Sequence, residues 1–209
     1  MARLDPEARE RARRWLIRRD PVLGELVRRV GPCGLRPRGT LYQALVRSIL
    51  YQQLAGSAAA AIHRRFREAF GGRDPTPAEL LRASPARLRR AGLSRQKAEA
   101  LRDVAEAFGS GRIRPRALQR RPDREIVEEL VRLRGVGEWT AHMVLIFCLG
   151  RPDVLPVGDY GVRKGIRALY GLPALPRPAE MEALAEPWRP FRTVACWYLW
   201  RHLDVAPPA

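Results

Sequence analysis

Residues 133–141 read Leu-Arg-Gly-Val-Gly-Glu-Trp-Thr-Ala, a string that is much more specific than a G-x-G match alone. A stripe of apolar residues at helical spacing leads up to it, formed by Ile126, Val127, Leu130 and Leu133. A second stripe of the same spacing follows it, formed by Thr140, Val144, Phe147 and Cys148. Such spacing indicates two amphipathic helices, and glycine adopts backbone conformations that other residues avoid. The stretch therefore predicts a tight hairpin between two helices.

The hairpin is expected to bind a phosphate. Because Gly135 and Gly137 have no side chains, backbone N–H groups at the start of the second helix can approach a phosphate, whose charge the helix dipole favours. Val136 is expected to point inward and pin the helices together, and Thr140 is grouped with these residues as DNA-binding. The arrangement resembles the helix-hairpin-helix motif, which would hold one DNA phosphate without reading sequence. A plain helical connection with a glycine stop is the alternative, because short G-x-G matches often have that role.

Outward from the hairpin, the pattern is helical almost everywhere. Apolar residues recur on one helical face within residues 41–50 and 98–108. Helix starts that combine a capping residue with a proline begin at Asp5, Thr76 and Ser84. No sustained alternation of the strand kind occurs. The sequence therefore predicts an all-α fold of about ten helices joined by short loops.

The composition is strongly basic. The 209 residues include 39 Lys and Arg against 22 Asp and Glu, which gives a net charge of +17. A polyanion is the expected partner, because neutralising phosphates releases counterions and drives association. Only Lys97 and Lys164 are lysines, however, and such arginine richness also arises from coding bias alone. Charge therefore favours a nucleic acid without deciding the matter.

Cysteine usage and hydropathy exclude several classes of protein. Cys33, Cys148 and Cys196 form no C-x-x-C motif and cannot supply the four thiolates of an iron–sulfur cluster, so no metal is expected. No apolar run approaches the roughly 18 residues of a membrane span, and the first residues lead into charge instead of a signal-peptide core. We therefore expect a cytoplasmic protein with reduced cysteines and no membrane partner.

Asp159 is the main candidate for chemistry. It follows Gly158 and precedes an apolar helical stripe that begins at Val162, so it stands at the head of a helix. Capping that helix is the ordinary interpretation and contributes roughly 1 kcal/mol. A capping carboxylate also stays ionised and fixed in direction, as a catalytic anion must be, so both roles can hold together. Asp153, shortly before it, is interpreted as a turn residue.

A hairpin followed by an aspartate-headed helix resembles the helix-hairpin-helix DNA glycosylases, and within them the 3-methyladenine DNA glycosylase II (AlkA-like) branch. The resemblance extends from about Asp20 to about His202. Besides the hairpin it rests on residues 20–23 with 29–33, 46–55, 92–94 with Lys97, 158–160 and 188–191, which follow in family order. One such match would be weak, whereas the ordered set is specific.

The resemblance implies two helical lobes with a DNA-binding cleft between them. Residues 40–150 would form a helical barrel lobe that carries the hairpin at 133–138. Residues 1–39 plus 151–209 would form the second lobe, with Asp159 facing the cleft. The chain is too short at its N-terminus for the extra β-rich lobe of longer enzymes in this branch, so pocket residues from that lobe must be replaced or missing.

The resemblance also assigns roles to single residues. Asp159 corresponds to the family's essential aspartate, and Trp139 stands where base-lyase relatives carry a Schiff-base lysine, which implies a monofunctional enzyme. The wedge that fills the gap left by a flipped nucleotide is expected at Gln53, with Leu54 next, although these residues could simply cap the preceding helix.

Aromatic side chains are expected to form the pocket for the flipped base. The candidates are Trp139, Tyr160, Tyr42, Tyr51 and Trp188. Alkylated purines such as 3-methyladenine and 7-methylguanine are cationic, so an aromatic face gains roughly 0.5–2 kcal/mol over the neutral base. The aromatic residues of 197–200 are interpreted as core.

The sequence thus predicts a monofunctional glycosylase that flips and hydrolytically excises alkylated purines in base excision repair. A glycosylase for uracil, mismatched or oxidised bases is one alternative, and a non-catalytic helix-hairpin-helix DNA-binding protein is another. The expected partner is double-stranded DNA with damaged bases, bound by a monomer. We expect no cofactor, and the sequence leaves open a structural monovalent cation at the hairpin.

Overall fold

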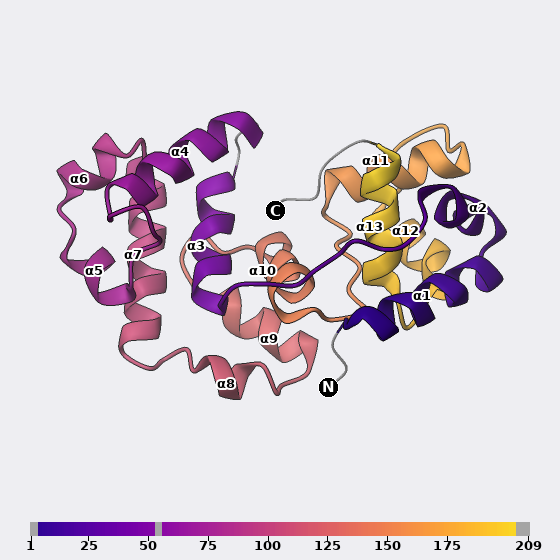
Figure 1. The fold of residues 1–209 in the computed structure, drawn as a ribbon, viewed down its shortest axis with the longest axis horizontal. Coiled ribbons are helices and arrows are strands. Elements are labelled where there is room, and N and C mark those ends of the chain that lie inside the picture. Colours follow the sequence, from indigo (N-terminus) through magenta and orange to yellow (C-terminus); the bar gives the residue numbers. More distant parts are fainter. Residues whose placement is uncertain (1–3, 53–55, 204–209) are drawn as a thin grey trace. The chain divides into compact units, whose positions relative to one another are not determined.

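The computed structural model describes residues 4–52 and 56–203, and every regular element in these ranges is a helix. The first half contains α1 (Pro6–Arg19), α2 (Pro21–Val30), α3 (Leu41–Tyr51), α4 (Gly56–Glu68), α5 (Pro77–Arg82), α6 (Pro85–Arg90) and α7 (Arg95–Gly109). The second half contains α8 (Pro115–Leu118), α9 (Asp123–Leu130), α10 (Glu138–Val144), a π-helical turn (Leu145–Leu149), α11 (Tyr160–Tyr170), α12 (Pro178–Leu184), a 3₁₀ turn (Glu186–Trp188) and α13 (Arg192–His202) (Figure 1). The prediction of an all-α fold is confirmed.

The helix starts follow the predicted capping chemistry. Asp5 caps α1 by accepting a 2.7 Å hydrogen bond from the backbone N–H of Ala8. Thr76 and Glu79 form a reciprocal capping box on α5, and Ser84 caps α6. Because α5, α6, α8 and α12 are only one or two turns long, the described part of the chain holds more and shorter helices than the sequence predicts.

The chain divides into two compact units, residues 39–144 and residues 1–38 with 145–209. We call them the hairpin unit and the Asp159 unit. The predicted lobes differ from them mainly at the second boundary, because residues 145–150 pack in the Asp159 unit. The ring of Phe147 stacks on Trp200 at 5.6 Å, and the N–H of Leu4 donates to the carbonyl of Gly150 at 2.9 Å.

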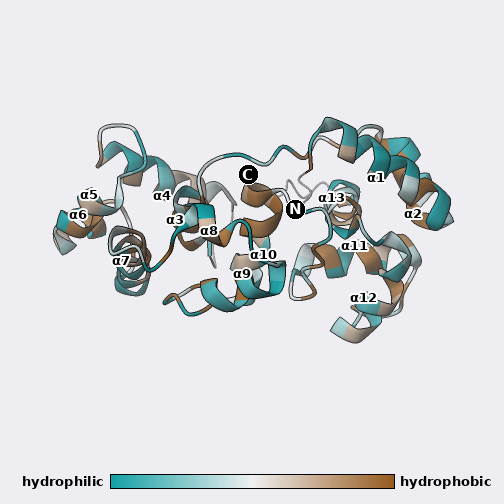
Figure 2. Ribbon diagram, turned by 90° about the horizontal axis from the view of Figure 1, so that it is seen from below, coloured by the Kyte–Doolittle hydropathy of each residue, from teal (hydrophilic) through white to brown (hydrophobic). Residues whose placement is uncertain are grey.

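The hairpin unit is built around α3 and α7. Helix α3 packs against α4, α7 and α10, while α7 also packs against α5 and α6. The side chains at the centre of this unit are completely buried and include Leu45, Val46, Ile49, Leu101, Val104 and Ile126. Apolar residues lie on the inner faces of the helices and polar residues on the outer faces (Figure 2).

The Asp159 unit is built around α13, which contacts α1, α2 and α11 (Figure 1). Residues 193–200 of this helix are all buried, which explains why it has no polar face. Helix α11 approaches α13 closely at Gly165, where an added Cβ would lie 2.9 Å from the Cβ of Leu199. In the described ranges, no helix is both long and apolar enough to span a bilayer.

Candidate functional site

The hairpin joins α9 to α10 through a turn in which the two glycines differ. Gly135 has a φ of +73°, in the left-handed region, and a Cβ there would lie 2.7 Å from the Cβ of Ala100 on α7. Gly137 needs no such conformation, and its Cβ would meet nothing within 4 Å. Gly135 therefore allows the turn to pack on α7, whereas Gly137 leaves open space beside the backbone.

The side chains of the hairpin serve its packing. Val136 is 4% exposed, as predicted for a residue that pins two helices together. Thr140 is 2% exposed, and its hydroxyl accepts a 3.2 Å hydrogen bond from the Gln52 side chain. The Thr140 side chain is buried and holds the end of α3, so any contact of this residue with DNA would be made by its backbone, and its assignment as DNA-binding stays a prediction.

Asp159 caps α11, and its carboxylate also accepts a hydrogen bond from a side chain of α13. Its Oδ1 accepts hydrogen bonds from the N–H of Val162 at 2.7 Å and from the indole Nε1 of Trp200 at 2.9 Å. The residue is 7% exposed. The predicted capping role is confirmed, and the second bond comes from a residue 41 positions away in the sequence.

Trp200 and Gly161 together make that second bond fit. Trp200 is 1% exposed, so its indole position is fixed by packing. A Cβ on Gly161 would lie 3.0–3.1 Å from two atoms of the Trp200 indole and from Oδ1 of Asp159. The glycine therefore leaves room for the indole to reach the carboxylate. Trp200 lies in the core as predicted, but its contact with Asp159 has no signal in the sequence, because no local spacing links the two residues.

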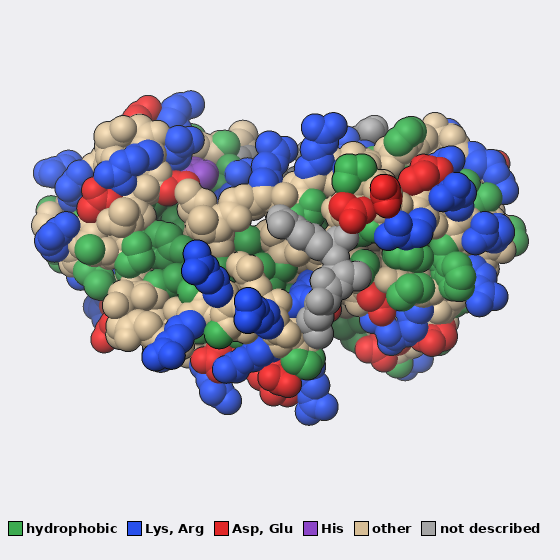
Figure 3. Space-filling view, turned by 60° about the horizontal axis from the view of Figure 1, so that its bottom comes forward, with side chains coloured by type: hydrophobic (Ala, Val, Ile, Leu, Met, Phe, Trp, Pro, Cys, Tyr) green, Lys and Arg blue, Asp and Glu red, His purple; other side chains and the backbone are tan. Residues whose placement is uncertain are grey.

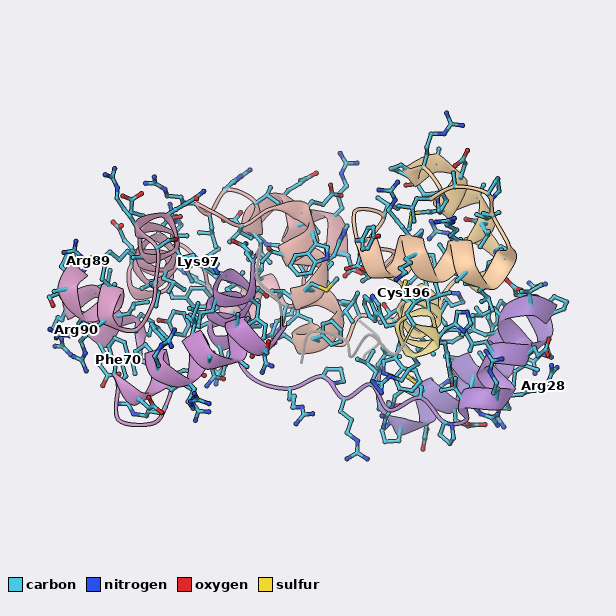
Figure 4. All side chains as sticks on the ribbon, turned by 90° about the horizontal axis from the view of Figure 1, so that it is seen from above. Arg28, Phe70, Arg89, Arg90, Lys97 and Cys196 are labelled. Atoms are coloured by element: carbon cyan, nitrogen blue, oxygen red, sulfur yellow. The ribbon has the colours of Figure 1, made fainter. Side chains whose placement is uncertain are left out.

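A buried charge at this position affects its neighbours. Cys196, on α13 (labelled in Figure 4), has a thiol whose pKa burial raises, and the nearby charge of Asp159 raises the pKa further. The thiol therefore stays neutral. Asp153, the other acid considered, binds Arg192 at 2.7 Å and Arg189 at 2.9 Å, so its carboxylate joins α13 to the preceding loop.

The predicted pocket aromatics have very different surroundings. Tyr160, next to Asp159, is 65% exposed and presents its ring to solvent. Trp139 and Tyr51 are half-buried, and the guanidinium of Arg47 lies over the Tyr51 ring at 5.0 Å.

Trp188 and Tyr42 do not have an open face. Trp188 is completely buried and donates its indole N–H to Asp20 at 2.7 Å. Tyr42 is 8% exposed and packs edge-on against Phe108 at 5.3 Å. Both rings pack in the cores of their units, so the structure gives no support to their assignment to the base pocket, which stays a prediction. Gln53 and Leu54, the predicted wedge, lie outside the described residues.

The all-helical fold, the Gly-Val-Gly hairpin and the buried aspartate at a helix head are the features expected of a helix-hairpin-helix protein. The chain belongs to the HhH-GPD superfamily of base excision DNA repair proteins, which residues 46–190 match.

Its relatives in that superfamily include two fission yeast proteins. The chain is 38% identical over 167 residues to DNA-3-methyladenine glycosylase 1 of Schizosaccharomyces pombe. The aligned region covers 79% of this chain and 73% of the relative. It is 32% identical over 197 residues to the alkylbase DNA glycosidase-like protein mag2 of the same yeast, with 92% of each chain covered.

Two solved structures are similar across nearly the whole chain. The Schizosaccharomyces pombe 3-methyladenine DNA glycosylase Mag1, in complex with abasic DNA, superposes with a TM-score of 0.85 at 35% identity and covers 91% of this chain and 95% of that chain. A DNA-3-methyladenine glycosidase from Bacillus halodurans gives a TM-score of 0.82 at 36% identity, and the match covers 91% of this chain and 88% of that chain.

Proposed function

We propose that this protein is a monofunctional DNA glycosylase that excises alkylated purines of the 3-methyladenine and 7-methylguanine type from duplex DNA, as a monomer. The observation that carries the proposal is the buried carboxylate of Asp159, fixed by two hydrogen bonds beside the exposed ring of Tyr160. The names of the relatives, 3-methyladenine glycosylases among them, support this substrate class.

DNA is held by the hairpin. Gly137 leaves space for a phosphate beside the backbone, and the first N–H groups of a helix have no carbonyl one turn earlier to bond. Overall charge does not single out this place, because basic side chains are spread over the face seen in Figure 3 with acidic ones among them.

The active site of a glycosylase cannot reach a base that is stacked inside the duplex, so the nucleotide must be turned out of the helix. The exposed face of Tyr160 suits a cationic base, since a cation–π contact gains roughly 0.5–2 kcal/mol over the neutral base. The wedge at Gln53 or Leu54 stays a prediction. Trp139, at the start of α10, stays a candidate for the pocket wall.

The bond that breaks is the one between C1′ of the deoxyribose and the base nitrogen, and its electron pair leaves with the base. A cationic base leaves readily, so the main need is an anion near the sugar as positive charge grows on it. Asp159 supplies that anion. A water molecule then adds to C1′ and loses a proton, which Asp159 can accept. The products are a free base and an abasic site, and no cofactor is required.

The hairpin carries no lysine that could form a covalent Schiff base with the DNA. Trp139 stands at the lysine position of base-lyase relatives, and the chain's two lysines are elsewhere: Lys97 donates to the carbonyl of Leu50 on α3, and Lys164 lies on α11. Borohydride treatment during the reaction is therefore expected to trap no protein–DNA adduct.

The experiment that tests the function is release of free bases from matched duplexes containing methylated purines, uracil or an oxidised purine. We expect release from the methylated duplex and much slower release from the others. Release from the uracil or oxidised duplex alone would assign another substrate to the same fold. Binding without any release would make the protein a non-catalytic DNA-binding protein.

A further inference from the structure

The Leu133–Arg134 and Gly135–Val136 peptide groups, which flank the left-handed turn, are held by side chains from outside the hairpin. Before the glycine, the backbone N–H of Arg134 donates to Oδ2 of Asp103 on α7 at 2.7 Å. After it, the carbonyl of Gly135 accepts from Nε2 of Gln52, at the end of α3, at 2.8 Å. Both ends of the left-handed turn are therefore tied to other helices of the same unit.

Asp103 is well suited to this contact. Its other oxygen, Oδ1, binds the Arg112 guanidinium at 2.8 Å, which leaves Oδ2 directed at the hairpin. Burial alone would raise the pKa of this carboxyl, but the N–H of Arg134 and the guanidinium of Arg112 outweigh it and hold the pKa below its usual value. Asp103 is thus an anion at neutral pH.

Gln52 is fixed as firmly on the other side. Its amide nitrogen donates to the carbonyl of Gly135 and to the hydroxyl of Thr140, so one side chain links both arms of the turn. The end of α3 is held in turn by Lys97 of α7 (labelled in Figure 4), whose Nζ donates to the carbonyl of Leu50 at 2.7 Å. Helix α7 therefore supports the hairpin both directly and through α3.

The arginine within the turn makes an exposed ion pair. The guanidinium of Arg134 lies 2.6 Å from the carboxylate of Glu99 on α7, which also pairs with Arg95 at 2.9 Å. The contacts of Asp103 and Gln52 act on the backbone of the turn and do not involve the charge of this residue.

We propose that Asp103 and Gln52 are positioning residues for DNA binding, which hold the Leu133–Arg134 and Gly135–Val136 peptide groups in the conformation that the hairpin needs. This inference rests on the proposed function only in taking DNA as the ligand of the hairpin. Neither side chain touches the reacting atoms.

The two explanations of Asp103 predict opposite changes in DNA affinity when its side chain is removed. If it acted only as a charge, removing an anion near a polyanion would tighten binding of DNA. If it positions the turn, removing it weakens binding, because the N–H of Arg134 loses its acceptor and the turn loses its conformation.

The test is the affinity of the full chain for a duplex with an abasic site, measured by fluorescence anisotropy at constant salt. We expect Asp103→Ala to weaken binding about tenfold, whereas Asp103→Asn, whose amide oxygen still accepts, stays near the unmodified protein. Glu106→Ala is the matched control. Glu106 lies on α7 in the same groove as Asp103, removal of its side chain changes the charge equally, and it is exposed. This control is expected to bind equally or more tightly.

Gln52→Met provides a second, uncharged variant. It keeps the length of the side chain and removes both donors, so we expect weaker binding with an unchanged dependence on salt, since no cation is lost. Gln96→Met, on the exposed surface of α7, is its control. Each measurement is made below the unfolding temperature of the variant, as recorded by circular dichroism, so that lost affinity is not lost fold.

The inference is overturned if Asp103→Ala binds as tightly as the unmodified protein or more tightly, or if Asp103→Asn is as weak as Asp103→Ala. Normal binding by Gln52→Met overturns the part that concerns Gln52. The proposed function fails separately: a protein that shows the expected order of affinities but releases no alkylated base keeps these positioning residues and loses the enzymatic assignment.

Discussion

The hairpin unit and the Asp159 unit differ in which groups are proposed to act on DNA. In the hairpin unit the proposed ligand-binding groups belong to the backbone, which is bonded to the side chains of Gln52 and Asp103. In the Asp159 unit the proposed catalytic group is a side chain, which accepts from one backbone N–H and one buried indole. Substitutions in the first unit should therefore change affinity for DNA, and substitutions in the second should change the rate of base release.

The largest effect is expected from Asp159→Asn. The amide oxygen can still cap α11 and accept from Trp200, so the fold is kept and only the charge is lost. We expect base release from methylated DNA to fall about 100- to 1000-fold, while affinity for abasic DNA stays equal or rises. Single-turnover kinetics measure the rate of base release, and fluorescence anisotropy measures the affinity for abasic DNA.

Asp153→Asn is the matched control for Asp159→Asn, because it removes the charge of another aspartate in the same unit. It loses the ion pairs with Arg189 and Arg192, so its unfolding temperature should fall while base release persists. If Asp159→Asn released 3-methyladenine at the normal rate, or Asp153→Asn lost activity with its fold intact, the catalytic carboxylate would have been misassigned.

A smaller effect on the same carboxylate is expected from Trp200→Phe. The substitution removes the indole N–H that binds Oδ1 of Asp159, a hydrogen bond to a charged group, so base release should slow about tenfold with affinity for abasic DNA unchanged. Trp15→Phe is the control, because it loses an indole hydrogen bond to Pro187 in the same unit but does not contact Asp159. Equal rates for both variants would show that Trp200 serves packing only.

The two glycines of the hairpin separate stability from binding. Gly135→Ala places a Cβ 2.7 Å from Ala100 at a φ of +73°, and we expect it to lower the free energy of unfolding by about 1–3 kcal/mol. Gly137→Ala meets nothing within 4 Å, so its stability should hardly change while its affinity for DNA falls, because the methyl group occupies the space beside the backbone. Urea unfolding and anisotropy check both. The reverse order would contradict the division of roles between the glycines.

The smallest effect concerns a contact in the hairpin unit that involves neither the Gly-Val-Gly turn nor Asp159. Asp74 binds His63 at 3.0 Å, and this hydrogen bond, with the arginines nearby, holds the pKa of Asp74 below its usual value despite burial. A depressed carboxyl pKa stabilises the fold above the pKa of the unfolded state, and that stabilisation is lost as pH falls through the folded-state pKa. Asp74→Asn should therefore cost about 0.5–1 kcal/mol near neutral pH and less as the solution is acidified. Urea unfolding at several pH values measures the difference, and a constant difference would exclude the ionisation of Asp74 as its source.

Much of the fold could be predicted because its signals are local. The caps at Asp5, Thr76 and Ser84 join groups only three residues apart, and so does the bond from Val162 to Asp159. Capping chemistry of this kind depends on residue type and spacing, both of which are visible in a linear sequence.

The pocket was harder to predict. Trp188 and Tyr160 are both aromatic residues in family motifs, yet one is completely buried and the other is 65% exposed. Helical spacing identifies an apolar face, but it does not tell whether that face meets another helix or stays open. The roles of Gln52, Asp103 and Trp200 were missed for a related reason, since each acts through a partner far along the chain.

Residue order alone thus specifies where helices begin, where the Gly-Val-Gly turn stands and which carboxylate heads α11, because these features arise from interactions within a single turn of chain. The packing of whole helices decides the rest. It brings Trp200 to Asp159, Gln52 and Asp103 to the hairpin, and Trp188 into the core. Contacts between distant segments depend on how many side chains fill a shared volume at once, and no single stretch of sequence contains that information.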